Sequence, residues 1–597
     1  MAEQVKRHEI EEALTWDLTL IFKSDEEQEK EVAALEQDLD AIKALKGTLG
    51  SSAESLLNAL QTVEKFERRI EVAYIYAHLK ADQDTANGKY QAMFAKTYGV
   101  YVKFAEATAP FTPELLEIPE ETLESYFGSN STLATYRHFF ERLTSKRAYT
   151  LSEKEEALLA GSSEVMEASG DIAAQLMNAD LKHGEVTTED GTKQRLTNGL
   201  YAQLLESNNR ALRQEAYNMM FTTFGSVKNT LASTLSTTVK GHNYNARIRG
   251  YKSARQEALS SNFVPEEVYD TLVKVVNDKL PIFQRYLNLR KKVLGLETLN
   301  MYDVYTPLVE DVDVKYTIEQ AKETTLKALA PLGEEYLSVL ERAFDERWID
   351  WIENEGKRTG AYSSGSYDTA PYILMNWRDS IDQLYTLVHE LGHSMHSYFT
   401  HQAQNHTYGK YPIFLAEIAS TTNENLLTEY LLKTETDPRV RQYVINHYLD
   451  GVKGTVFRQT QFAEFEHFMH EQDAAGVPLT HEFLTQAYAE LNAKYYAVVE
   501  QDDKIALEWA RIPHFYYNYY VFQYATGFSA ASALAARILT GNQEYIDQYF
   551  YFLKAGESAY PIDVMKHAGV DMTQSTYIEE ALAVFEQRLE ELEQLLG

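Results

Sequence analysis

Much of this sequence repeats apolar residues every three or four positions, the spacing that places them on one face of an α-helix. The residues that interrupt helices are scarce, because the 597-residue chain contains only 13 prolines and 28 glycines. The sequence therefore predicts a mainly α fold built from long amphipathic helices. Two stretches show the pattern clearly: Val32, Leu35, Leu39, Ile42, Leu45 and Leu49 near the start, and Leu582, Phe585, Leu589, Leu592 and Leu596 at the end.

Extended structure is predicted at two places only. Val186–Lys193 has the pattern of a hairpin that turns at Asp190-Gly191. Gly360–Ser363 and Tyr372–Trp377 form a second candidate pair, joined by a small polar loop. We therefore expect a small β-sheet just before the segment that carries the most specific motif of the chain. No Pro/Gly/Ser-rich linker divides the sequence, so we expect an N-terminal helical region, 1–195, to pack directly on a region 196–597.

The charge balance excludes several kinds of partner. The chain has 56 Lys and Arg against 89 Asp and Glu, a net charge of −33. Such a chain is unsuited to nucleic acid, because binding there depends on neutralising phosphates, and it is repelled by anionic membranes. The excess acid serves solubility, and it also suits a cavity that concentrates cationic ligands.

Composition also bears on the compartment and on membranes. The absence of cysteine excludes disulfides and thiolate catalysis, and the acidic N-terminal sequence lacks the apolar run of a signal peptide, so we expect a cytoplasmic protein. Residues 515–536 contain no Asp, Glu, Lys or Arg over about the length of a membrane span. Their many tyrosines, serines and amides indicate instead a helix buried in protein or lining a cavity.

Residues 389–393 read His-Glu-Leu-Gly-His. Two histidines four positions apart on a helix project from the same face, where both imidazoles can bind one metal ion, and the acid between them can act on a water molecule. Ser380 followed by Gln383 predicts the start of that helix, and apolar residues between them and the motif supply a buried face. We therefore predict that His389 and His393 are zinc ligands.

A catalytic zinc ion needs a third protein ligand. His396 is unsuited, because it lies only three residues beyond His393 on the same rigid helix, and a metzincin would need glycine there. The next predicted helix, which begins near Pro412, carries Glu417 and Glu424 seven positions apart on one face. One of them could bind the metal while the other holds a ligand imidazole; spacing favours Glu417 without excluding Glu424.

The motif, together with Phe414-Leu-Ala-Glu417-Ile-Ala-Ser, resembles the thimet oligopeptidase family, and most closely its bacterial oligoendopeptidase F branch. Trp16-Asp-Leu near the start and two segments within residues 511–527 are similar too, so the resemblance covers essentially the whole chain. It implies a large, helical, ellipsoidal body split by a deep channel, an oligoendopeptidase F N-terminal-type segment at about 110–185, and one zinc ion per chain whose third ligand is Glu417.

The resemblance also implies further site residues. His514, Tyr520 and Tyr524 occupy the positions of transition-state donors, although Tyr517 and Tyr519 are rivals in the same tyrosine-rich segment. Gly360-Ala361 resembles the edge strand that pairs with the backbone of an extended peptide.

Together with the resemblance, these residues predict a zinc endopeptidase that cleaves short unstructured peptides and favours cationic ones. Glu390 would accept the proton of the attacking water and pass it to the leaving amine, so that no covalent intermediate is needed. His467 and His470 are interpreted as core or surface residues of a helix. The alternatives are a metallo-exopeptidase, against which the absence of a Gly-x-Met-Glu-Asn motif argues, and a helical peptide-binding protein without activity.

Overall fold

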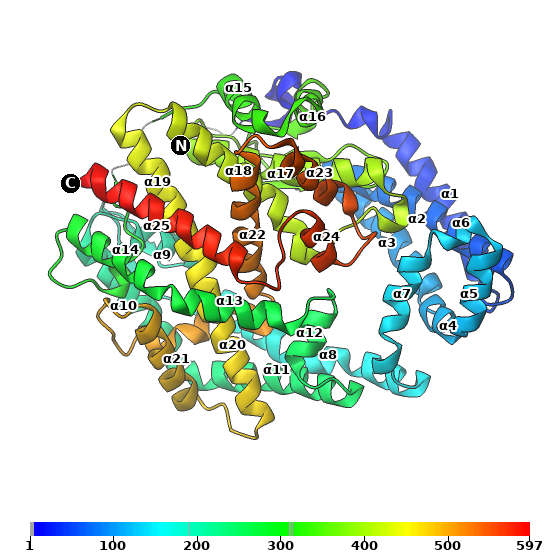
Figure 1. The fold of residues 1–597 in the computed structure, drawn as a ribbon, viewed down its shortest axis with the longest axis horizontal. Helices are drawn as coiled ribbons and strands as arrows, with labels where there is room; N and C mark the ends of the chain where they lie inside the picture. The colour runs from blue at the N-terminus through cyan, green and yellow to red at the C-terminus, as the bar shows by residue number, and fades with distance from the viewer. Residues whose placement is uncertain (1–4, 190, 310–311, 313) are drawn as a thin grey trace. The chain divides into compact units, whose positions relative to one another are not determined.

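The computed structural model describes residues 5–189, 191–309, 312 and 314–597. It is mainly helical, as predicted, and long helices make up most of the ribbon (Figure 1). The chain forms two compact units, each assembled from three separate segments: unit 1 is Met1–Thr150, Val314–Leu427 and Leu534–Gly569, and unit 2 is Leu151–Asp313, Thr428–Ala533 and Val570–Gly597. These units are defined by packing and do not test the predicted division near residue 195, which stays a prediction.

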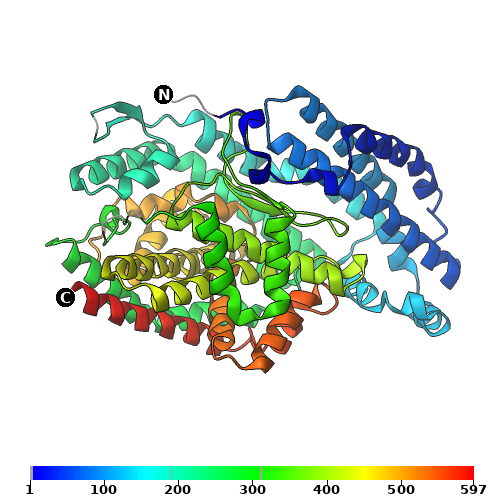
Figure 2. The ribbon, with the colours of Figure 1, turned by 90° about the horizontal axis from the view of Figure 1, so that it is seen from above.

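Unit 1 begins with a bundle of helices that pack on one another, α1, α2 and α3, drawn in blue in Figure 2. The predicted apolar stripe of α1 is buried in this bundle, and Gly47 follows the helix with a positive φ of 80°. The helices of unit 1 are α1 (Asp25–Lys43), α2 (Ala53–Asp82), α3 (Gly88–Thr108), α4 (Phe111–Glu117), α5 (Glu120–Ser129), α6 (Ser131–Ala134), α7 (Arg137–Ser145), α15 (Ile318–Leu329), α16 (Glu334–Asp345), α17 (Ile381–Ala403), α23 (Gln543–Ala555), α24 (Pro561–His567) and the first part of α18 (Ile413–Thr434).

A three-stranded sheet in unit 1 precedes α17, where a small sheet was predicted. β4 (Tyr362–Ser364) pairs antiparallel with β5 (Tyr372–Leu374), which confirms the predicted pair, and β5 pairs parallel with β3 (Ile349–Asp350), which was not predicted. The order β3-β5-β4 leaves β4 at the edge of the sheet, since no other strand of the described residues pairs with it.

The sheet is anchored to its own unit by one buried carboxylate. Asp350 is fully buried and pairs with Arg7 at 2.5 Å and with Lys357 at 2.6 Å. Tyr372 and Leu374 of β5 pack in the same apolar cluster as residues of α2. These contacts hold β3 and β5, the strands behind the edge strand β4, in unit 1.

Unit 2 contains the predicted hairpin and the C-terminal amphipathic helix. β1 (Glu185–Thr187) pairs antiparallel with β2 (Lys193–Arg195); Asp190 of the predicted turn lies outside the described residues, and Gly191 has a positive φ of 80°. The helices are α8 (Glu153–Gln175), α9 (Asn198–Leu205), α10 (Arg210–Ser226), α11 (Lys228–Arg249), α12 (Ala254–Ser260), α13 (Glu266–Asp278), α14 (Leu280–Val293), α19 (Pro438–Val452), α20 (Arg458–Ala474), α21 (His481–Tyr495), α25 (Thr576–Leu596) and most of α22 (Phe522–Ile538).

The expectation that the uncharged stretch 515–536 forms a helix is wrong for its first part. A short 3-10 helix ends at Tyr516, Tyr519 adopts a positive φ of 53°, and α22 begins only at Phe522. The backbone N–H of Tyr519 donates to the fully buried carboxylate of Glu466 at 2.7 Å, so that a contact distant in sequence holds the break. Within the described residues, none of the helices combines the length and the apolarity needed to cross a bilayer.

Candidate metal centre

Helix α17 carries the His-Glu-Leu-Gly-His motif near its middle. The predicted start of the helix is confirmed, because the hydroxyl of Ser380 accepts a hydrogen bond from the backbone N–H of Gln383 at 3.2 Å. Leu384, Leu387, Val388 and Leu391 are buried on the face that holds the helix in unit 1.

Helix α18 crosses α17 at very close range, and Gly392 makes this possible. A Cβ atom at position 392 would lie 2.5 Å from the Cα of Ser420 and 2.8 Å from its backbone nitrogen. Asn423 stabilises the same crossing. Its side-chain amide donates to the carbonyl of Val388 in α17 at 3.2 Å, and the side-chain oxygen of Asn423 accepts a hydrogen bond from the hydroxyl of Tyr336 at 3.0 Å. This packing brings the carboxylates of α18 to the histidines of α17.

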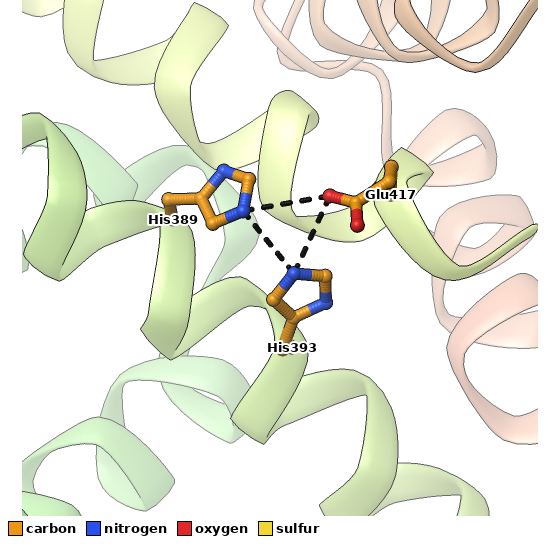
Figure 3. Close-up of side chains that lie close together, drawn as sticks. All are labelled: His389, His393 and Glu417. Carbon is orange, nitrogen blue, oxygen red and sulfur yellow. Dashed lines mark hydrogen bonds and ion pairs between the residues drawn. The ribbon is translucent and has the colours of Figure 1, made fainter. Parts of the chain in front are cut away.

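Three donor atoms converge at the crossing (Figure 3). The Nε2 atoms of His389 and His393 are 3.2 Å apart, and Oε2 of Glu417 lies 3.4 Å from each of them. Three ligands bound tetrahedrally at about 2.0–2.2 Å from one ion would be about 3.3–3.6 Å apart. The donor set and its spacing therefore fit zinc, and the residues form a group able to hold a metal ion.

Glu424, one of the two carboxylates considered from the sequence, contacts the opposite side of an imidazole. The Nδ1–H of His389 donates to Oε1 of Glu424 at 2.6 Å, which leaves Nε2 facing the other two donor atoms. Burial would lower the pKa of His389, but the hydrogen bond and charge of Glu424 raise it to about 9. The two carboxylates thus occupy different positions around the same imidazole.

The carboxylate of Glu417 is held in its charged form. Burial would raise its pKa, but the hydrogen bond and charge of His393 and the charge of His389 lower the pKa of Glu417 to about 2. The hydroxyl of Ser420 also donates to Oε2 of Glu417 at 3.1 Å. An ionised carboxylate between two imidazoles is the charge arrangement that a divalent cation requires.

Glu390 lies beside His389, His393 and Glu417, but the surroundings of its carboxylate differ from those of Glu417. It is buried, 8% exposed, and burial raises its pKa above the ordinary value for glutamate. The backbone N–H of Ser363 in β4 donates to its carboxylate, and the hydroxyl of Ser363 pairs with that of Ser394 at 2.8 Å. A carboxylate with a raised pKa beside donor atoms that could hold a metal ion is suited to accepting and returning a proton.

Gly360 and Ala361 precede β4 rather than lying in it. Gly360 has a positive φ of 86°, and its carbonyl accepts a hydrogen bond from the side chain of Asn376 at 2.8 Å. Peptide groups alternate in direction along a strand, so those of Ala361 face the same edge as those of Ser363. Substrate pairing at this edge stays a prediction.

His514, Tyr520 and Tyr524 gather in unit 2. His514 Nε2 and the hydroxyl of Tyr524 are 3.4 Å apart, and the ring of Tyr520 lies 6.3 Å from that of His514 and 5.4 Å from that of Tyr524. Burial lowers the pKa of His514, so its imidazole is neutral near pH 7. Of the two rivals, Tyr519 pairs through its hydroxyl with Nδ1 of His467 at 3.0 Å, whereas Tyr517 is 54% exposed. Roles in stabilising a transition state stay predictions.

His396 and His470, also considered from the sequence, lie outside the group formed by His389, His393 and Glu417. His396 is buried with its ring stacked 3.7 Å from that of Tyr411, and His470 is buried with its Nε2 3.1 Å from Nδ1 of His242.

Sequence reasoning missed Ser363, Asn423 and the contact of Gly392. A glycine inside an otherwise favourable helix was the available signal for a close helix crossing. The other two act through contacts that no local pattern reveals.

Comparisons with known proteins show what the chain as a whole is similar to. Residues 203–584 match the model of peptidase family M3, and residues 114–183 match that of oligopeptidase F. The chain is 50% identical to oligopeptidase PepF of Bacillus subtilis over 100% of its own length and 90% of that protein, and 51% identical to group B oligopeptidase PepB of Streptococcus agalactiae over 99% and 98%. The crystal structure of oligoendopeptidase F from Enterococcus faecium is 49% identical, covers 96% of this chain and 99% of its own, and has a TM-score of 0.74.

Proposed function

Because this chain belongs to peptidase family M3, within its oligopeptidase F group, we propose that it is a zinc-dependent endopeptidase that hydrolyses internal bonds of short, unstructured peptides. The observation that carries this proposal is the convergence of His389, His393 and Glu417, with donor atoms that lie within 4.8 Å of one another. Membership of the family makes the protein a peptidase, and the geometry supports the route of hydrolysis proposed below.

Zinc bound by these three side chains would supply a water of lowered pKa and would polarise the carbonyl of the bond to be cleaved. Glu390 accepts the proton of the attacking water and returns it to the leaving nitrogen. The backbone N–H of Ser363 holds the carboxylate of Glu390 in place, and Glu424 holds His389 in the tautomer whose Nε2 can bind a metal. Each of these side chains is therefore fixed by a second contact, as precise proton transfer requires.

The developing oxyanion needs donors in addition to a metal. We propose His514, Tyr520 and Tyr524 for this role, on the strength of the family pattern and of their proximity to one another in unit 2. Ala361 would pair with the extended backbone of the peptide at the edge of the sheet, and Gly360 supplies the positive φ that turns the chain into this edge.

The proposed restriction to short peptides rests on the family resemblance, which implies a deep channel with the metal on its floor. The two relatives named above are oligopeptidases. An extended strand can enter such a channel, whereas a folded domain must first break its own hydrogen bonds.

One assay tests the reaction class. A quenched fluorescent peptide with an acetylated N-terminus and an amidated C-terminus should be cleaved internally, lose cleavage when a chelator removes the metal, and regain it when zinc is added. An exopeptidase would need a free terminus and would leave the blocked peptide intact. Cleavage that continues in excess chelator would contradict the proposed metal chemistry.

A second assay tests the size limit. Peptides of increasing length around one fixed bond should be cleaved well up to a couple of dozen residues, and denatured casein should survive. If kcat/KM were the same for all peptides of the series and for casein, the site would be an open groove. That result would contradict the size limit but not the proposed metal chemistry.

A further inference from the structure

A cavity of about 540 Å³ lies within unit 1, next to the edge strand and to α17. It begins at Gly365 and Ser366, directly after β4, and continues along α17 at Ser397 and His401. Those two α17 residues are one and two turns beyond His393, about 6 and 12 Å along the helix axis. The volume is typical of sites that bind small ligands or side chains.

Tyrosine rings make up the walls. We call the cavity the tyrosine pocket, defined by Tyr74, Tyr98, Tyr101 and Tyr367. The rings of Tyr98 and Tyr101 are stacked with their centres 6.4 Å apart, and the ring of Tyr74 lies 6.5 Å from the first and 6.0 Å from the second. Tyr98 is 49% exposed and Tyr101 is 39% exposed, so much of their surface is left for a ligand.

Tyr367 lines the pocket from the loop between β4 and β5, and contacts hold both its hydroxyl and its ring. Its hydroxyl donates to the carbonyl of Gln404 at 2.7 Å, and the guanidinium of Arg68 lies 5.0 Å from the centre of its ring. These two contacts fix this wall of the pocket.

The charged groups of the pocket neutralise one another. Lys410 pairs with Glu71 at 2.9 Å, and Nε2 of His406 lies 3.3 Å from the other oxygen of Glu71. Burial would raise the pKa of Glu71, but His406 and Lys410 lower it, while burial lowers the pKa of His401 and keeps that imidazole neutral. Among the described residues that line the pocket, no unpaired charge is left to recognise a peptide terminus or a charged side chain. Its aromatic surface therefore favours an aromatic ligand.

The edge strand indicates which part of a peptide reaches the pocket. Ser363 lies beside Glu390, and the pocket begins two residues later, at Gly365. A peptide that adds to β4 pairs more stably in the antiparallel direction, so its residues near Gly365 precede the bond that lies near Glu390. At about 3.3 Å per residue, the span of 6 to 12 Å corresponds to roughly two to four residues.

We propose that the tyrosine pocket binds an aromatic side chain of the peptide substrate, two to four residues before the cleaved bond. This inference rests on the proposed function and adds a substrate preference to it.

The test is a set of blocked fluorogenic peptides that share one cleaved bond and are otherwise alanine-rich, with a single phenylalanine placed from four residues before the bond to three residues after it. The wild-type protein should cleave one of the peptides with phenylalanine two to four residues before the bond about 10- to 100-fold faster in kcat/KM than the all-alanine reference. The double variant Tyr98→Ala/Tyr101→Ala should lose this preference, so that its kcat/KM for the phenylalanine peptide falls to that for the all-alanine reference.

Tyr551→Ala is the matched control, because Tyr551 is 38% exposed in unit 1 and lies outside the pocket; it should keep the preference. The same peptides are also titrated against the Glu390→Gln protein, with and without the double substitution, so that binding is measured where cleavage is slow. The inference would be overturned if phenylalanine raised kcat/KM only at positions after the bond or at no position. It would also be overturned if phenylalanine raised kcat/KM equally in the wild type and in the double variant. If none of the peptides were cleaved, the proposed function would be refuted instead, and the binding titration would still decide the role of the pocket.

Discussion

Replacing Gly392 with alanine tests whether the close crossing of α17 and α18 sets the metal centre. The added Cβ would meet the Cα of Ser420 at 2.5 Å and the carbonyl oxygen of Ala419 at 2.9 Å. Both are backbone atoms, which cannot rotate aside as a side chain can.

The magnitude follows from these distances. Carbon atoms in ordinary contact are about 3.5–4.0 Å apart, so the two helices must separate by about 1 Å. Overpacking of this kind costs about 1–3 kcal/mol, and the better helix propensity of alanine returns at most about 1 kcal/mol. Glu417 lies three residues before Ser420 and would move with it, whereas metal sites tolerate about 0.2 Å. We therefore expect lower thermal stability and a loss of at least about tenfold in zinc affinity.

Zinc affinity is measured by competition with a chromophoric chelator, and stability by thermal unfolding of the metal-free protein. Gly161→Ala is the control: Gly161 lies within α8, a Cβ there would meet nothing within 4 Å, and the substitution should leave zinc affinity unchanged. If Gly392→Ala kept both the wild-type zinc affinity and the wild-type melting temperature, the close crossing would not govern the site.

Three further predictions concern other groups. Glu417→Ala should leave the protein without zinc at ordinary metal concentrations, whereas Glu424→Ala should weaken binding by about 10–100-fold; metal analysis showing the reverse order would exchange their roles. Glu466 is buried, and its Oε2 has no hydrogen-bond partner among the described residues, so burial raises its pKa. The folded protein therefore keeps a proton on Glu466 that the unfolded chain releases above about pH 4.5. The melting temperature of Glu466→Gln should therefore rise relative to that of the wild type between pH 5 and 8, and a gap that does not change with pH would contradict a protonated Glu466. If the net charge of −33 acts at the site, cationic peptides should have a higher kcat/KM than acidic ones of equal length, and added salt should reduce the difference; a ratio that salt does not change would assign the charge to solubility.

Much of the fold and the metal group could be predicted from the sequence, because both depend on helical periodicity. His389 and His393 share a helix face through their spacing alone, and the positions of Glu417 and Glu424 differ by seven residues on one face. Periodicity could not decide which carboxylate faces the imidazole Nε2 atoms, since that depends on how the two helices cross. The resemblance favoured Glu417, and the crossing at Gly392 places Glu417 there.

The failures have local physical causes. β3 has only two residues, too few for an alternating pattern to show. The break at Tyr519 depends on the hydrogen bond that its backbone N–H donates to the carboxylate of Glu466, 53 residues away, and no local sequence pattern predicts a partner at that separation. The hydrogen bond from Ser363 to Glu390 likewise joins a strand to a helix through tertiary packing.

The measurement that tests the central claim most directly is the turnover and zinc content of Glu390→Gln, determined on the same preparation. The substitution keeps the size of the side chain and leaves the three proposed metal ligands, His389, His393 and Glu417, in place. We expect about one zinc ion per chain, a wild-type melting temperature, and turnover of a blocked peptide reduced by at least roughly 10²–10⁴-fold. A protein that carries a full complement of zinc and cleaves the peptide at the wild-type rate would contradict the assignment of Glu390 as the base.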